Sequence, residues 1–237
     1  MPHDSPDPQR RGRRAPTGDR RPRRRGIRGP WVFAAVAVAV AAVLASALVR
    51  STVADPYRIP SGSMEPLLLP GDRISVDRSA YDAAPVRRGD VVVVDGEGSF
   101  VPYDSRPAAA KSVDVALQWL GLAPDTTAVV KRVAGTGGDT VSCCTGDGLL
   151  QVNGEPVQED YLAELPASTV PFTATVPEGR LFLLGDNRHH SLDSRALLGA
   201  PGGGMIAESS VVGRVTAIAW PPARRTDLEQ VDALSGR

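Results

Sequence analysis

The chain has 237 residues, of which 42% are hydrophobic and 23% charged, enough to bury the core of one folded domain. Its formal net charge of zero hides an uneven distribution. Residues 1–30 hold ten Arg and three Asp, whereas the rest of the chain holds 17 basic and 24 acidic residues. Two adjacent cysteines and three histidines exclude a four-thiolate zinc site, so we expect no metal.

The first fifty residues predict a tail and a membrane anchor. Residues 1–30 are rich in Arg, Pro, Gly and Asp without apolar periodicity, which is typical of a disordered segment. Residues 31–49 carry no charge, and as a helix these 19 residues would be about 28 Å long, roughly the hydrocarbon thickness of a bilayer. Ten preceding Arg against a single Arg50 immediately afterwards predict a cytoplasmic N-terminus and an extracytoplasmic domain.

One alternative for the apolar segment is a removable signal. Ala45-Ser46-Ala47 has the small-x-small pattern of a cleavage site. We favour an uncleaved anchor because the segment reaches full spanning length.

Beyond residue 50 the pattern predicts a mostly β, antiparallel, barrel-like domain over residues 50–222, followed by a C-terminal tail at 223–237. Asn153-Gly154 predicts a two-residue hairpin turn. Small insertions are expected at about 99–127, including an amphipathic helix at 108–122, and at 142–180. Short apolar or alternating runs bounded by Gly, Pro and Asp mark strands at 74–76, 91–94, 128–133, 149–152, 181–184 and 211–219.

The cysteine pair allows two interpretations. Cys143 and Cys144 could close an eight-membered ring on the oxidising side of a membrane. The sequence favours two partly buried thiols instead.

Two distant segments suggest a nucleophile and a base. Pro and Gly fix an irregular backbone around Ser61 and Ser63, which presents a hydroxyl well. Lys131 lies among aliphatic residues, where burial lowers the pKa of an ammonium group. The chain has two lysines against 25 arginines. Of these two residue types, only lysine can lose its proton in a protein. A lysine in an apolar run is therefore a candidate general base. The alternative is a lysine whose stem lies on the sheet while its ammonium group reaches water.

A third segment, 185–195, is dense in polar groups directly after an apolar run. Such groups need internal hydrogen bonds next to a core. Asp193 can pair with Arg195, and Ser191 can orient the Lys131 amine.

Four segments resemble, in order, the sequence boxes of bacterial type I signal peptidases: PSGSMEP at 60–66, GDRISV at 71–76, VKRVAGTGGD at 130–139 and GDNRHHSLDSR at 185–195. The resemblance extends to residues 220–222. It implies coiled antiparallel sheets of the signal peptidase type behind one transmembrane helix. It also implies a membrane-bound serine endopeptidase that removes signal peptides from exported preproteins after Ala-x-Ala-like sites, without a cofactor.

By that resemblance Ser63 is the nucleophile, Lys131 the general base, and Ser191 the residue that positions the lysine. Ser61 would join the Ser63 backbone N–H in the oxyanion hole. The other residues that the resemblance assigns are a structural ion pair, Asp193 with Arg195, and shallow apolar substrate pockets formed by Ile59, Pro60, Met64 and Val130. The implied partners are exported preproteins, the lipid bilayer and, by proximity, the export translocon, with no nucleic acid.

Two departures from the family pattern keep a rival open. His189 and His190 follow GDNR where the family commonly has Asp-Asn, and Arg78 stands where Lys is frequent. A Ser/His/Asp hydrolase could use Ser63, one of these histidines, and Asp186 or Asp193. A non-enzymatic membrane-anchored β module is the remaining alternative.

Overall fold

The computed structural model describes residues 29–52, 57–119 and 126–228 of the chain. The chain divides into two units, residues 1–49 and 50–237, and each is described by itself. Most of the expected basic tail, residues 1–28, lies outside the described residues.

The N-terminal unit contains the helix α1 (Gly29–Thr52), which covers the whole uncharged segment. Pro30 falls in its first turn, where the missing N–H costs no intrahelical bond. Large apolar side chains are exposed along its described part, namely Trp31, Val32, Phe33, Val36, Val38, Val40 and Val43. Within the ranges that the structure covers, no helix combines the length and apolarity required to cross a membrane. The membrane span at 31–49 stays a prediction.

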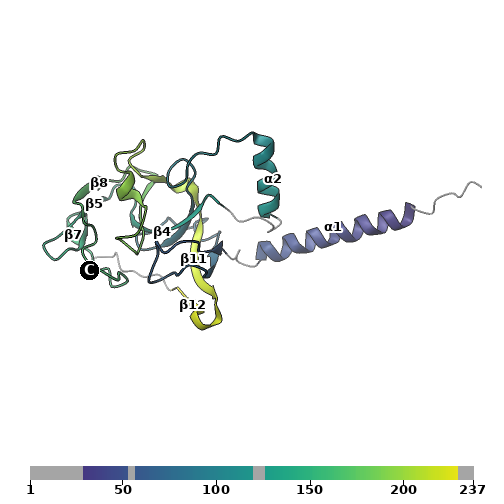
Figure 1. Cartoon of the computed structure of the whole chain (residues 1–237), viewed down its shortest axis with the longest axis horizontal. Helices are drawn as coiled ribbons and strands as arrows, with labels where there is room; N and C mark the ends of the chain where they lie inside the picture. Colours follow the sequence, from purple (N-terminus) through teal and green to yellow (C-terminus); the bar gives the residue numbers. More distant parts are fainter. Residues whose placement is uncertain (1–28, 53–56, 120–125, 229–237) are drawn as a thin grey trace, which may run out of the picture. The chain divides into compact units, whose positions relative to one another are not determined.

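The second unit is mostly β (Figure 1), and every pairing between its named strands is antiparallel, which confirms that part of the predicted fold class. Its elements are β1 (Tyr57–Arg58), β2 (Arg73–Asp77), β3 (Val91–Asp95), α2 (Ala108–Trp119), β4 (Ala128–Gly135), β5 (Thr140–Cys143), β6 (Leu150–Val152), β7 (Glu155–Pro156), β8 (Phe172–Thr175), β9 (Arg180–Leu184), η1 (Ser194–Leu197), β10 (Ile206–Ala207), η2 (Glu208–Ser210), β11 (Val211–Trp220), η3 (Pro222–Arg224) and β12 (Thr226–Asp227).

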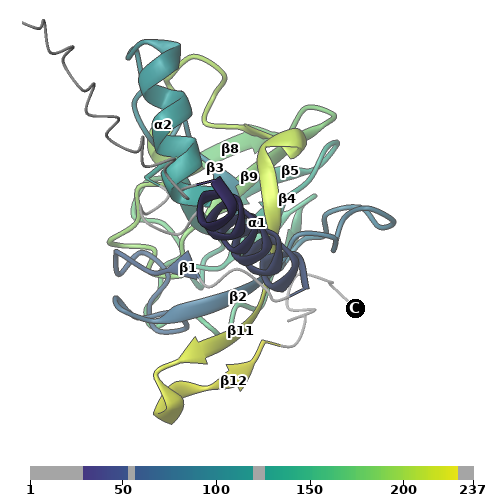
Figure 2. The ribbon, with the colours of Figure 1, turned by 90° about the vertical axis from the view of Figure 1, so that its right-hand side faces the viewer.

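The larger sheet has the order β1-β2-β11-β3-β4-β9-β10, with β12 paired to β11. Figure 2 shows β2, β11 and β12 side by side. β-branched residues dominate β3, and Val91 to Val94 are all buried, as expected for a strand covered on both faces. The pairing of β11 shifts register against both β2 and β3, which bends this long strand.

The smaller sheet has the order β7-β6-β5-β8. Its β6–β7 hairpin turns at Asn153 and Gly154, with φ of 56° and 87°, which confirms the predicted two-residue turn. A buried cluster joins this sheet to the larger one. The Phe172 ring of β8 stacks on the Phe182 ring of β9, with centroids 5.6 Å apart.

Cys143 and Cys144 form a disulfide at the end of β5, so the expectation of two thiols is wrong. Cys143 is buried in the cluster between the sheets. The sequence favours two thiols because a disulfide between neighbouring cysteines closes a small ring of eight atoms.

The large sheet extends past residue 222, where the sequence analysis placed the end of the domain. β12 pairs with β11 through Ala217 and Ile218. In η3, Arg224 forms an ion pair with the buried Asp72, at 3.1 Å. Residues 229–237 of the expected tail lie outside the described residues.

Replacing Phe182 with Ala should destabilise the domain by about 3 to 5 kcal/mol, because the ring is fully buried between the two sheets. Urea unfolding followed by circular dichroism would measure this. Val170→Ala is the control, expected within about 0.5 kcal/mol because that side chain is exposed. Equal effects of the two substitutions would contradict the inter-sheet core.

Candidate active site

Ser63 lies in the connection between β1 and β2, and hydrogen bonds close both ends of that connection. The Ile59 N–H donates to the Asp72 carbonyl and the Gly71 N–H donates to the Ile59 carbonyl, both at 2.8 Å. The side chains of Ile59 and Met64 are buried in one apolar cluster. Buried anchors on either side therefore hold an otherwise irregular turn that carries Ser63.

Lys131 comes from the middle of β4, which is paired on both sides by β3 and β9. Its direct partner across β3 is the fully buried Val92. Only 3% of Lys131 is exposed. Its Nζ lies 2.8 Å from the Ser63 Oγ, so residues 68 positions apart form a hydrogen-bonded pair.

Burial lowers the pKa of Lys131 to about 8, against the opposing attraction of Asp193 and Asp186. Neither carboxylate forms an ion pair with the lysine in the described part of the chain. Asp186 accepts two hydrogen bonds from Arg132, at 2.8 and 2.6 Å, and Asp193 is paired with Arg195. The two carboxylates attract the dehydrated amine from a distance but form no ion pair with it. The neutral form of the amine therefore becomes accessible near neutral pH.

The segment after β9 binds the nucleophile turn directly. The Asn187 N–H donates to the Ser63 carbonyl at 3.1 Å, and its side-chain amide donates to the Gly62 carbonyl at 3.0 Å. A Cβ atom on Gly185 would lie 2.5 Å from the Ser63 carbonyl oxygen and 2.1 Å from the Ser191 Oγ. Position 185 therefore has room only for glycine.

The two other serines differ in their contacts. The Ser61 hydroxyl donates to the Ser63 Oγ at 3.4 Å, so it lies beside the nucleophile candidate. The Ser191 Oγ is buried and has no hydrogen-bond partner among the described residues. The bond from Ser191 to the Lys131 amine, which the sequence suggested, is absent from this arrangement.

Asp193 and Arg195 form an ion pair that also supports the local backbone. The arginine donates from Nε to Oδ1 at 2.9 Å and from Nη2 to Oδ2 at 2.7 Å. Asp193 accepts in addition from the Gly185 N–H at 3.1 Å and from the Arg195 N–H at the start of η1. This pair thus joins η1 to the glycine that abuts the nucleophile turn.

The predicted substrate-contacting residues lie at different depths. Val130 is partly buried and packs against the cluster that contains Ile59 and Met64. Pro60 is exposed. Of these four residues, Ile59 and Met64 are therefore buried, whereas Pro60 and part of Val130 are accessible.

The structure gives no support to the Ser/His/Asp rival. His189 and His190 are both exposed. Each candidate carboxylate, Asp186 or Asp193, is already bound to an arginine. Within the described ranges, Ser63 shares a side-chain hydrogen bond with Lys131 and Ser61 and with no histidine.

Sequence reasoning missed three groups around this site. Arg132 binds Asp186, Asn187 binds the nucleophile turn, and Glu159 binds Arg188. An arginine directly after Lys131 in a buried strand was a usable signal, because a buried charge requires a partner. Glu159 gave no such signal, since its partner lies 29 positions away.

Residues 31–220 match the family model of signal peptidases, peptidase S26. A probable signal peptidase I of Mycobacterium leprae (strain TN) is 36% identical over 87% of this chain and 82% of the relative. Signal peptidase I of Mycobacterium tuberculosis (strain H37Rv) is 38% identical over 84% of this chain and 76% of the relative. A solved signal peptidase I of Enterococcus faecalis V583 is 27% identical, with a TM-score of 0.37, over 56% of this chain and 97% of that one.

The match covers both segments that supply the hydrogen-bonded Ser63 and Lys131 as well as the segment that braces them. The chain belongs to the signal peptidase family, peptidase S26.

Proposed function

We propose that this chain is a type I signal peptidase, a serine endopeptidase that removes signal peptides from exported preproteins. The observation that carries the proposal is the 2.8 Å contact between the Ser63 hydroxyl and a buried lysine amine that no carboxylate of the described residues neutralises. Family membership supports the substrate class.

In this mechanism the neutral Lys131 amine accepts the Ser63 proton while Ser63 Oγ attacks the carbonyl carbon of the scissile peptide bond. The resulting ammonium gives a proton to the leaving amine, and an acyl-enzyme remains on Ser63. The same amine then takes a proton from a water molecule, whose oxygen attacks the ester. The Lys131 ammonium returns that proton to the leaving Ser63 Oγ, which releases the new carboxyl group and restores the dyad. Each proton that the lysine accepts is returned, so no cofactor is required.

The negative oxygen of the tetrahedral intermediate needs donors close to Ser63. We assign this role to the Ser63 backbone N–H and the Ser61 hydroxyl, which already lies 3.4 Å from the nucleophile oxygen. Asn187 supports the same function indirectly, because its two hydrogen bonds fix the carbonyls of Gly62 and Ser63.

The substrate would bind as an extended strand along the sheet edge, with alternate side chains entering shallow apolar pockets. Ile59 and Met64 are buried and would form the floor, whereas Val130 and Pro60 are the more accessible members. Such shallow pockets favour small residues, in agreement with cleavage after Ala-x-Ala.

We further propose that residues 31–49 anchor the enzyme in the bacterial cell membrane, in a single pass with the N-terminus in the cytoplasm. The absence of charge over 19 residues, the ten Arg before them and the exposed apolar side chains of α1 support this. The catalytic domain would then face the side on which preproteins leave the export translocon.

Lys131→Arg should reduce turnover by about 10²-fold to 10⁴-fold or more, because arginine keeps the charge but cannot accept the serine proton. Ser63→Ala should be comparably inactive, and the double variant little worse than either. The measurement is in vitro cleavage of a preprotein ending in Ala-x-Ala, with circular dichroism to verify folding. Lys111→Arg is the matched control and should retain activity, since Lys111 pairs with Glu97 and Tyr103 away from the dyad. Near wild-type cleavage by Lys131→Arg would disprove the dyad.

The pH profile should follow the lysine. The base must be neutral, so kcat/KM should fall about tenfold per pH unit below the Lys131 pKa of about 8 and level off above it. Steady-state rates between pH 5.5 and 9.5 would show this. A midpoint near 6.5, the ordinary pKa of a histidine, would instead revive the histidine rival.

Membrane topology gives a separate test of the anchor. An external protease added to intact spheroplasts should digest the region after Arg50, while a tag at the N-terminus survives. The enzyme should also stay in the membrane pellet after an alkaline wash. Recovery of the full-length chain in the soluble fraction would refute the anchor without affecting the dyad.

A further inference from the structure

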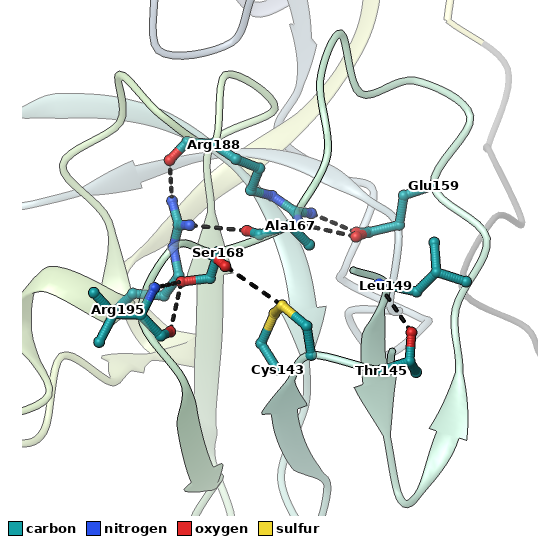
Figure 3. Close-up of a disulfide and its surroundings, with 10 residues drawn as sticks. Cys143, Thr145, Leu149, Glu159, Ala167, Ser168, Arg188 and Arg195 are labelled. Carbon is teal, nitrogen blue, oxygen red and sulfur yellow. Dashed lines mark hydrogen bonds and ion pairs between the residues drawn. A yellow bond between two sulfur atoms is a disulfide. The ribbon is translucent and has the colours of Figure 1, made fainter. Parts of the chain in front are cut away.

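Glu159 and Tyr161, in the segment between β7 and β8, contact two arginines next to the candidate active site. Glu159 is buried, and its carboxylate binds both terminal nitrogens of Arg188, with Nη1 2.8 Å from Oε2 (Figure 3). The Tyr161 hydroxyl donates to Oε1 of the same carboxylate at 2.5 Å. The guanidinium carbon of Arg132 lies over the Tyr161 ring, 3.9 Å from the ring centroid.

Both arginines in turn hold the segment that braces the nucleophile. Arg132 binds Asp186 through two hydrogen bonds, and Arg188 Nε donates to the Gly185 carbonyl at 3.2 Å. Asn187, which lies between Asp186 and Arg188 in the sequence, donates the two hydrogen bonds to the carbonyls of the nucleophile turn. Contacts thus run from Glu159 and Tyr161 through two arginines and residues 185–187 to Ser63.

These groups also balance charge beside the dyad. Arg132 and Arg188 are matched by Asp186 and Glu159, all of them buried. The Tyr161 phenol remains neutral, because burial and the adjacent Glu159 carboxylate raise its pKa. The other charged groups that face this region are Asp193 and its partner Arg195, while His189 and His190 are exposed. Asp186 and Asp193 are the carboxylates that act on the charge of Lys131, and Arg188 in turn is attracted by both Glu159 and Asp186. Removing Glu159 would therefore leave the buried charge of Arg188 to be balanced by Asp186.

We propose that Glu159 and Tyr161 are positioning residues for peptide-bond cleavage, which act on Ser63 and Lys131 through Arg188 and Arg132. The small sheet then contributes to catalysis rather than to stability alone. This inference rests on the proposed dyad.

The first test compares Glu159→Gln with Asp160→Asn, an exposed neighbour that serves as control. Glu159→Gln should lower kcat roughly 10-fold to 100-fold with little change in KM, since a small misplacement of the nucleophile turn is costly for the chemical step. Tyr161→Phe keeps the ring over Arg132 but removes the bond to Glu159, and it should lower kcat by less. Asp160→Asn should match wild type in both constants.

The second test uses the pH midpoint of kcat/KM, which a purely structural role would not move. Glu159→Gln leaves Arg188 to be balanced by Asp186, whose attraction raises the pKa of Lys131. The lysine ammonium then loses part of that attraction, so the midpoint should move down by roughly half a pH unit. Arg188→Gln should move it up. The double variant Glu159→Gln/Arg188→Gln should return the midpoint toward wild type while its kcat stays low, because the bond to Gly185 is still missing.

The outcomes separate this inference from the dyad assignment. If Ser63→Ala is inactive but Glu159→Gln keeps wild-type kcat and midpoint and only lowers the melting temperature, the positioning role is wrong. If Glu159→Gln does not fold, Tyr161→Phe decides, and an unchanged kcat in that variant overturns the proposal. Full activity of Ser63→Ala would refute the dyad itself.

Discussion

The site depends on one buried amine that forms no ion pair with any of the described residues. Removing an ammonium group from water is costly, and a carboxylate partner would repay that cost but hold the proton in place. Here the nearby carboxylates, Asp186 and Asp193, are already bound by Arg132 and Arg195. The sheet buries the Lys131 amine, and the two arginines keep these carboxylates from forming an ion pair with it. This environment suits the role of general base that we propose for Lys131, which lies 2.8 Å from the Ser63 hydroxyl.

Arginine suits this arrangement because its guanidinium stays protonated and binds a carboxylate with two donors. Arg132, Arg188 and Arg195 each bind a carboxylate in this way. All three also donate to backbone carbonyls, among them those of residues 89, 185 and 188. Permanently charged arginines thus hold the segments around the site, and the proton transfer that we propose falls to a lysine, whose amine can lose its proton.

Many of the strands were predictable from the sequence because their signals are local, whereas the pairing of Ser63 with Lys131 was expected from the resemblance of four segments to one family. Alternation and β-branched runs located β2, β3, β4, β9 and β11, and Asn153-Gly154 located a hairpin. The strands β1, β10 and β12 have two residues each, too short for any periodicity. Pairings such as Glu159 with Arg188 depend on how distant segments meet, which no local pattern encodes. The same reasoning anticipated a partner for Ser191, but its hydroxyl is unbonded among the described residues.

The place of β11 in the large sheet has a consequence for the order of assembly during synthesis. Its residues 211–220 lie between β2, which follows the turn that carries Ser63, and β3, which pairs with the strand of Lys131. A chain synthesised only as far as residue 210 therefore lacks the strand that connects β2 to β3 and β4. Pairing of such distant segments is slow because a long loop must close first. The contact between Ser63 and Lys131 therefore forms late, after nearly the whole domain has been synthesised.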